Sequence, residues 1–309
     1  MLRRYVTADV FADRMFGGNP LAVVLDAEGL TTAQMQSVAS EFNYSETTFV
    51  LAPRDDQNSA QVRIFTPTKE VPFAGHPNVG TAAMLALTRE TAGDAPVDHL
   101  VFEEVAGLVP IRLLRIAGNI VGAELTAPEG LSIGASVSAQ DAADCLSIRS
   151  SEIYESNHPP QVLSVGLPFL VAELVSVASL SRCKPVTSVH ERVLPPIGTD
   201  SVFAYARGSS PGHLHGRMFS PLDACTEDPA TGSATGATIA LLASLEAKRD
   251  EERSWQVEQG VEMGRPSLIL GRTEIRSGVL TAVHIAGRVV QVMSGSFWLP
   301  SGFARQAQK

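Results

Sequence analysis

The feature that most constrains the fold of this chain is a pattern that occurs twice. In the first half, an expected strand and a proline-containing loop lead to Ala74–His76, and a segment rich in alanine and leucine follows. In the second half, the same order leads to Thr231–Ser233 and to a similar segment. Small side chains on one face let a helix lie close to a sheet. The repetition predicts an internal duplication, with two similar α/β halves that each pack a helix against a sheet.

The length of the chain also favours two domains, because 309 residues is about twice the average domain of roughly 150. We expect a first half-domain of residues 1–127 with 295–309, and a second half-domain of residues 128–294. Residues 126–136, which contain proline and two glycines, are the best candidate linker. If the halves face each other, both repeated helix starts point into one cleft, where we expect the active site.

Local patterns predict several elements outside the repeat. Thr31 and Gln34 form a capping box, in which each side chain satisfies a free backbone N–H of the other residue. Apolar residues then follow at the spacing of one buried helix face, namely Met35, Val38, Ala39 and Phe42. Near the end of the chain, we expect two short strands at Ala282–Ile285 and Val289–Met293.

The charge of the chain restricts its partners. The net charge is −9, the pI is about 5.3, and the basic residues are scattered. A protein that holds DNA or RNA by its phosphates needs a basic face, so we expect no nucleic-acid partner. A small anionic ligand remains compatible with this charge, because backbone N–H groups can hold a carboxylate locally.

Cysteine usage and hydropathy indicate the compartment. Three cysteines, odd in number and far apart, form neither a disulfide framework nor a Cys-x-x-Cys metal site, which favours a reducing compartment. The basic N-terminus has no continuous apolar run of the kind found in a signal peptide. No apolar run approaches the ~18–20 residues that a membrane span needs. We therefore expect a cytoplasmic protein without a membrane partner.

The two glycine-led helix starts are candidate anion sites. The first N–H groups of a helix lack partners within the helix and carry partial positive charge. Gly75 and Gly232 have no Cβ to block a ligand from this backbone, so the two starts are suited to a carboxylate or a developing enolate. Either glycine alone is more simply explained as part of a loop-to-helix turn, and only the paired occurrence favours a binding role.

Four polar side chains near these starts could carry chemistry. Glu46 lies among apolar residues, which would raise the pKa of its carboxyl toward the range needed to take and return a proton. The plain alternative is a surface glutamate at a strand end. His76 could equally be a capping or packing histidine. Asp228 could be a loop-anchoring carboxylate. Ser233 lacks a Gly-x-Ser-x-Gly context, so hydrogen bonding to a substrate fits it better than a nucleophilic role.

Metal, thiol and nucleotide chemistry have weaker support. His213 and His215 flank one residue and would share a strand face, but no third ligand with suitable spacing is evident, so we expect no metal site. Cys225 is more simply a small packing residue than a catalytic thiol. The chain has neither a P-loop motif nor a dinucleotide fingerprint. We therefore expect no cofactor.

Five motifs, in order along almost the whole chain, resemble those of the PhzF-like isomerases of phenazine biosynthesis. They are Gly18–Val24, Ser45–Thr47, Phe65–Pro77, Glu227–Ala234 and Gln259–Ser267. The resemblance implies a diaminopimelate-epimerase-like fold, in which two pseudo-symmetric halves each wrap a sheet around a central helix. It also implies an active site in the cleft between the halves, a homodimer, and isomerisation of a dihydro-hydroxyanthranilate by proton transfer without metal or organic cofactor.

The resemblance assigns roles to individual residues. It implies that Glu46 shuttles the proton and that His76, Asp228 and Ser233 contact the substrate or assist the transfer. The remaining positions that match, Asn19, Gly75 and Gly232, are expected to bind the substrate. Racemases on this scaffold carry a cysteine before each helix-opening glycine, and this chain has Ala74 and Thr231 there. Neither side chain forms a thiolate, which leaves one-base chemistry through Glu46.

The function that we expect is therefore a cofactor-independent isomerase that moves a proton on a small cyclic carboxylate by acid/base catalysis. Extra length around residues 140–160 and 183–215 would reshape the pocket, so the resemblance does not specify the substrate. A second hypothesis is a non-catalytic protein that binds a small carboxylate on the same scaffold. A third, less favoured, is a metal- or thiol-dependent hydrolase.

Overall fold

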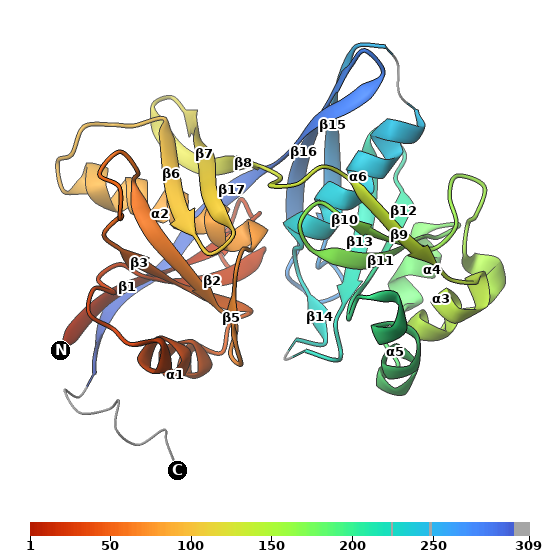
Figure 1. The fold of residues 1–309 in the computed structure, drawn as a ribbon, viewed down its shortest axis with the longest axis horizontal. Helices are drawn as coiled ribbons and strands as arrows, with labels where there is room; N and C mark the ends of the chain where they lie inside the picture. Colours follow the sequence, from red (N-terminus) through yellow and green to blue (C-terminus); the bar gives the residue numbers. More distant parts are fainter. Residues whose placement is uncertain (224, 247–248, 300–309) are drawn as a thin grey trace. The chain divides into compact units, whose positions relative to one another are not determined.

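A computed structural model describes residues 1–223, 225–246 and 249–299 (Figure 1). The chain forms two compact units. The first contains Met1–Leu125 and the described residues from Ala286 onward, and the second contains Thr126–Ile285. The boundaries expected from the sequence lie at 127/128 and 294/295, and residues 300–309 of the expected first half-domain lie outside the described residues.

The sheet of the first unit closes on itself around a helix. Its pairings run β17–β1–β2–β3–β4–β6–β7–β8 and return to β17, with β2–β3 and β4–β6 parallel. The strands are β1 (Leu2–Val10), β2 (Asn19–Val24), β3 (Glu46–Leu51), β4 (Ala60–Phe65), β6 (His99–Glu104), β7 (Gly107–Ile116), β8 (Asn119–Thr126) and β17 (Val279–Trp298). Helix α2 (Gly75–Thr91) contacts β1, β2, β3 and β7. All of its residues from Gly75 to Ala86 are buried, as expected of a central helix.

Two smaller elements complete the first unit. Helix α1 (Thr32–Phe42) packs its apolar face on β3 and β4. Both hydrogen bonds of the expected capping box are present between Thr31 and Gln34, so this prediction is confirmed. The helix ends at Asn43, which adopts a left-handed conformation with φ 52°. The two-residue strand β5 (Glu70–Val71) pairs with β4 just before α2 begins.

The sheet of the second unit has helices on both faces. Its strands are β9 (Ser132–Ser136), β10 (Gln161–Ser164), β11 (Pro168–Glu173), β12 (Val202–Arg207), β13 (His213–Phe219), β14 (Glu227–Asp228), β15 (Glu251–Gln259) and β16 (Ser267–Arg276). Helix α6 (Gly232–Leu245) packs on β10, β11, β15 and β16. A separate core joins alternate residues of β11 and β12 to α3 (Ala139–Leu146), α4 (Val177–Arg182) and α5 (Thr187–Val193). Two short 3₁₀ helices, η1 (Ser150–Glu152) and η2 (Pro195–Ile197), connect these elements.

The two units repeat the same order of pairings, which confirms the expected duplication. Each contains an antiparallel hairpin (β1–β2 and β10–β11) and adds a parallel partner to the second strand of that hairpin (β3 and β12). An antiparallel strand, a two-residue strand and the central helix follow (β4, β5, α2 and β13, β14, α6). The next strand is again parallel (β6 and β15). The fold class is therefore the expected mixed α/β fold with two pseudo-symmetric halves.

Two sequence-based expectations are wrong in detail. Part of the expected linker, Ser132–Ser136, forms β9 and pairs with β10, because backbone pairing does not require apolar side chains. The two expected late strands are one continuous strand, β17. Gly287 lies within this strand and permits close packing, since a Cβ there would lie 2.2 Å from Phe11 Cδ1.

No helix among residues 1–223, 225–246 and 249–299 is long and apolar enough to cross a membrane.

Candidate functional site

In the first unit, the fold brings together side chains from two strand starts and one helix start. Asn19 is the first residue of β2, Glu46 is the first residue of β3, and these strands are parallel neighbours in which Leu21 pairs with Glu46. His76 is the second residue of α2, the helix enclosed by this sheet. Because parallel strands begin at the same edge of a sheet, Asn19 and Glu46 lie at one edge, where they meet His76.

A chain of contacts fixes how the His76 ring carries its proton. The hydroxyl of Ser45 donates to Asn19 Oδ1 at 3.2 Å, which leaves the amide nitrogen of Asn19 facing His76. Asn19 Nδ2 then donates to His76 Nδ1, also at 3.2 Å. An amide nitrogen only donates, so Nδ1 must be the acceptor, and the hydrogen of the neutral ring resides on Nε2. His76 Nε2 lies 3.2 Å from Glu46 Oε2.

Burial keeps the His76 ring neutral. The residue is 5% exposed, and loss of solvation lowers its pKa to about 3. Because the His76 ring is neutral, it places no positive charge beside Glu46 that would favour the ionised form of this carboxyl group. The Nε2–Oε2 approach is short, but it is not aligned as a hydrogen bond, which is common for catalytic groups before a substrate binds. The side chain of Glu46 is 19% exposed, so it can reach a ligand.

The start of α2 presents backbone donors at this site. Gly75 is the first helical residue, and the N-cap residue Ala74 makes no side-chain hydrogen bond to the helix. A helix start without such a cap keeps its N–H groups available to a ligand. The expected grip at Gly75 therefore lies at the same helix start as His76.

One titratable group at this helix start was not predicted from the sequence. Glu104, the last residue of β6, lies near Asn78 in the first turns of α2. Burial raises the pKa of Glu104 to about 8, and both of its carboxyl oxygens are buried without a hydrogen-bond partner among the described residues. The hairpin that carries Glu104 is held against the loop before α2 by the bond from Ala106 N to Pro72 O (3.2 Å). No sequence signal distinguished Glu104 from a solvated charge at a hairpin end.

In the second unit, a buried glutamine holds the loop that leads into α6. Gln259 is 1% exposed, and its Nε2 donates to the carbonyl of Asp228 at 2.7 Å. Its Oε1 accepts from the backbone N–H of Thr231 at 3.0 Å. The hydroxyl of Ser267 donates to the carbonyl of Pro229 at 2.8 Å. The late motif Gln259–Ser267, to which the sequence analysis assigned no role, therefore supports this loop.

The predicted residues of the second unit lie on and beside this loop. Asp228 is 8% exposed, and its Oδ2 accepts from the hydroxyl of Thr231 at 2.5 Å, so it does anchor the loop. Gly232 is the first residue of α6, and the N-cap Thr231 makes no side-chain bond to the helix. Ser233, the second helical residue, is half-buried. The helix start of this unit thus has the same uncapped form as that of α2.

The cysteine thiols are poorly suited to catalysis. Burial raises the pKa of Cys145 and of Cys183 to about 12, so both stay protonated at neutral pH. The thiol of Cys225 donates to the carbonyl of Glu227 at 2.9 Å. These positions do not favour a thiol-dependent mechanism.

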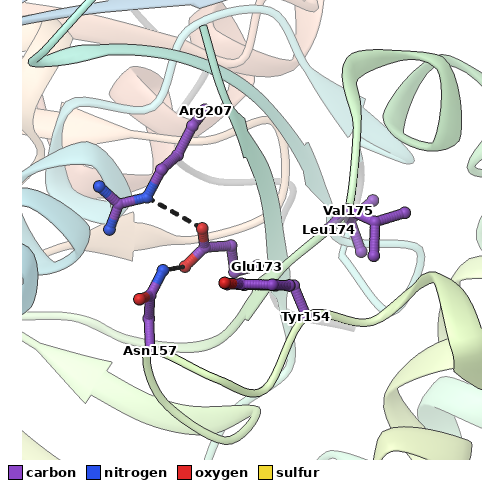
Figure 2. Close-up of a pocket in the computed structure, with 6 residues that line it drawn as sticks. All are labelled: Tyr154, Asn157, Glu173, Leu174, Val175 and Arg207. Atoms are coloured by element: carbon purple, nitrogen blue, oxygen red, sulfur yellow. Dashed lines mark hydrogen bonds and ion pairs between the residues drawn. The ribbon is translucent and has the colours of Figure 1, made fainter.

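A cavity of about 390 Å³ lies in the second unit (Figure 2). Its central group is the carboxylate of Glu173, which accepts from Asn157 Nδ2 at 2.8 Å and from Arg207 Nε at 3.0 Å. The hydroxyl of Tyr205 donates to the same carboxylate at 2.8 Å. These polar groups satisfy one another, so the cavity is a weaker candidate for proton transfer than the site around Glu46.

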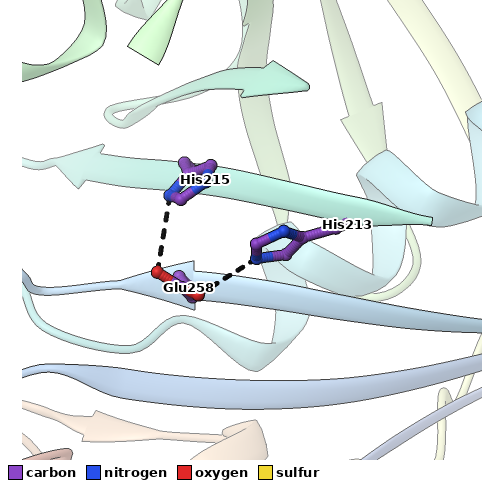
Figure 3. Close-up of side chains that lie close together, drawn as sticks. All are labelled: His213, His215 and Glu258. Atoms are coloured by element: carbon purple, nitrogen blue, oxygen red, sulfur yellow. Dashed lines mark hydrogen bonds and ion pairs between the residues drawn. The ribbon is translucent and has the colours of Figure 1, made fainter. Parts of the chain in front are cut away.

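A third potential metal ligand lies near His213 and His215. Glu258 of β15 lies beside these histidines of β13 (Figure 3). The spacing of residues along the chain does not reveal Glu258, because it comes from a strand distant in sequence.

Comparisons with known proteins agree with these observations. Residues 8–295 match the model of the PhzC-PhzF family, described as phenazine biosynthesis-like protein. The chain is 36% identical to the trans-2,3-dihydro-3-hydroxyanthranilate isomerase of Pseudomonas chlororaphis over 300 residues, which cover 96% of this chain and 100% of that protein.

Solved structures give the same result at the level of the fold. The phenazine biosynthesis protein of the PhzF family from Bacillus anthracis superposes with a TM-score of 0.84 at 27% identity, covering 97% of this chain and 100% of the other. A hydroxyproline epimerase from Agrobacterium vitis shares the fold alone, with a TM-score of 0.63 at 13% identity over 98% of this chain and 94% of the other. The chain therefore belongs to the phenazine biosynthesis-like PhzC-PhzF family and is an isomerase with the epimerase-like fold of that family.

Proposed function

We propose that this isomerase moves a proton on a small cyclic carboxylate without a cofactor, in a reaction similar to that of trans-2,3-dihydro-3-hydroxyanthranilate isomerase. The observation that carries the proposal is the Ser45–Asn19–His76–Glu46 chain of contacts, with its neutral histidine and its partly exposed carboxylate. A protein that only binds a carboxylate has no need of a carboxylate base held beside an oriented neutral imidazole.

Glu46 is the group that takes and returns the proton. Its carboxylate removes a proton from a carbon next to an unsaturated or carboxylate-bearing centre, and the electron pair of that C–H bond delocalises into the substrate. The protonated Glu46, whose side chain is 19% exposed and can exchange its proton with solvent, then protonates a different carbon, so no net proton or electron is gained. The Nε2–H of His76 lies 3.2 Å from Glu46 Oε2 and would hydrogen bond this carboxylate once a substrate aligns the two groups.

The uncapped helix starts supply the electrostatic part of the proposal. The backbone N–H groups at the start of each central helix, at Gly75 and at Gly232, are suited to hold a carboxylate or a developing negative charge. Asp228 and Ser233 are hydrogen-bonding partners that assist the transfer in this proposal. The bond from Thr231 keeps the Asp228 carboxylate in one orientation.

The proposal is tested with Glu46→Gln, assayed with trans-2,3-dihydro-3-hydroxyanthranilate in deuterated water. Loss of the base should lower kcat by about 10²–10⁴ and abolish incorporation of deuterium into the product. Glu41→Gln, at an exposed glutamate of α1, is the matched control and should leave both unchanged. Undiminished deuterium incorporation in the Glu46 variant would refute its role. Tight binding without any exchange in the native protein would instead favour the binding hypothesis.

Asn19→Asp tests the orientation of His76. An aspartate accepts but does not donate, so the ring would move its hydrogen to Nδ1 and turn a lone pair toward Glu46. We expect kcat/KM to fall at least about tenfold, and the ¹⁵N shifts of the ring to report the exchanged tautomer. An unchanged tautomer together with reduced activity would show that Asn19 acts by another route.

We also propose that the protein is a cytoplasmic homodimer, on the basis of its resemblance to the family. Light scattering should give twice the chain mass of 32.8 kDa, and a single chain mass would contradict the proposal.

A further inference from the structure

Three potential metal ligands converge on one face of the sheet in the second unit (Figure 3). His213 and His215 are two residues apart on β13, so their side chains point to the same face. Strand β15 runs parallel beside β13, with His215 opposite Glu258 and His213 opposite Gln256. Glu258 is therefore directly opposite His215 and diagonally across from His213. A cluster of this kind cannot be read from spacing along the chain.

The distances within this cluster suit a small divalent cation. Glu258 Oε1 lies 3.1 Å from His213 Nε2, and Oε2 lies 3.5 Å from His215 Nδ1. Ligands at about 2.0–2.1 Å from a tetrahedral zinc ion are roughly 3.3 Å apart, so these separations are close to those of a formed site. All the ligand atoms lie within 4.8 Å of one another.

The surroundings hold the ligands in place and leave them accessible. The three side chains are 21%, 24% and 41% exposed, so an ion and a water molecule can reach them. The other face of β15 is fixed by the buried residues Trp255, Val257 and Gln259. Gly208 provides room for the first histidine, since a Cβ there would lie 2.6 Å from His213 Nδ1. Ligands carried by paired strands are positioned more accurately than ligands on loops.

We propose that His213, His215 and Glu258 bind one divalent transition-metal ion of the zinc type, with water at the fourth position. Two imidazoles and one carboxylate match the preferences of Zn²⁺, whereas Mg²⁺ and Ca²⁺ favour all-oxygen sites. The ion would join β13 to β15. Strand β13 pairs with β14, which contains Asp228, and β15 ends at Gln259, which donates to the carbonyl of Asp228. By joining β13 to β15, the ion would make the support of the loop before α6 more rigid.

The experiment is zinc titration of chelator-treated protein by calorimetry, with cobalt absorption as the spectroscopic readout. We expect one zinc ion to bind per chain and to raise the Tm. Cobalt should give a visible absorption spectrum typical of an ion with a low coordination number. His213→Asn, His215→Asn and Glu258→Gln should each weaken zinc binding at least about tenfold. Circular dichroism of each variant shows that a loss of binding does not come from unfolding.

The matched control is His284→Asn. His284 also pairs with a glutamate, with its Nε2 3.1 Å from Glu274 Oε1, but this pair is not part of any three-ligand group among the described residues. The control should bind zinc like the native protein. The proposal is overturned if the native protein binds no zinc, if binding survives all three ligand substitutions, or if His284→Asn weakens binding equally. None of these readouts depends on isomerase activity, so the result is independent of the proposed function.

Discussion

His76 and Glu104 lie at the start of the same helix, and burial shifts the pKa of each toward the uncharged form. The pKa of His76 falls to about 3, so the stability that its neutral ring contributes is present above about pH 6.5 and is lost as the pH falls toward 3. The pKa of Glu104 rises to about 8, so the stability of its protonated form is present below about pH 4.5 and is lost as the pH rises toward 8. Between pH 4.5 and 6.5 the two dependences oppose each other.

Glu104→Gln should remove the loss of stability that Glu104 causes as the pH rises toward 8. Since one pKa unit corresponds to about 1.4 kcal/mol, the free energy of unfolding of this variant relative to the native protein should rise by up to that amount per pH unit between about pH 5 and 8. Urea denaturation at several pH values measures the difference. Glu103→Gln removes a neighbouring carboxylate that accepts from the backbone of Arg54 and Asp55, and its effect should not vary over this range. A constant difference for Glu104→Gln would contradict the assignment of its pKa.

At the scale of the element, the two central helices share an unusual start. Neither α2 nor α6 has a side-chain cap, although the surface helix α1 has a complete capping box. The second helix start is instead held from outside by Gln259, which satisfies one donor and one acceptor of the preceding loop. The loop is thereby fixed without a side-chain hydrogen bond from the N-cap residue Thr231 to α6.

Gln259→Ala should therefore affect both stability and activity. The substitution leaves the N–H of Thr231 and the carbonyl of Asp228 without this partner in a buried place, which should cost at least about 2 kcal/mol. Activity should also fall, because Asp228 loses its support. Urea denaturation and kcat/KM measure the two effects. Gln256→Ala, at an exposed position on the same strand, should change neither, and equal losses at both positions would argue against the role of Gln259.

At the scale of the whole molecule, closure of the first unit depends on β17, which reaches it from the second unit. The pairing of β8 with β17 brings two glycines close together, so that a Cβ on Gly122 would lie 1.9 Å from the carbonyl oxygen of Gly287. The obstacle is backbone and cannot rotate away. Glycine at this contact is a packing requirement of the closed sheet.

Gly122→Ala should destabilise the protein by about 1–3 kcal/mol, the usual cost of overpacking. Gly130→Ala is the control, because a Cβ at Gly130 meets nothing within 4 Å. Thermal unfolding compares the two variants, and an unchanged Tm for Gly122→Ala would show that the strands separate at little cost.

The sequence predicted what depends on local order and missed what depends on pairing between distant strands. The capping box at Thr31, the glycine-led helices and the duplication all follow from residues close together in the chain. The meeting of Glu258 with His213 depends on the register of β13 against β15, and short motifs do not encode that register. The close approach of Gly122 to Gly287 is likewise invisible in the sequence. The burial that shifts the pKa of Glu104 arises only when the β6–β7 hairpin packs against α2 through β7.

The path of β17 also has a consequence for biosynthesis. Strand β1 pairs with β17 from Leu2 opposite Trp298 onward, so the two ends of the described chain form one ladder. The second unit, residues 126–285, is continuous in sequence. During translation, the first unit is therefore synthesised first but completed last, because it needs β17. Until β17 is synthesised, β1 and β8 lack this partner and remain unpaired sheet edges while the second unit folds. Emergence of the last strand from the exit tunnel, rather than synthesis of the first half, sets the moment at which the sheet around Glu46 and His76 can close.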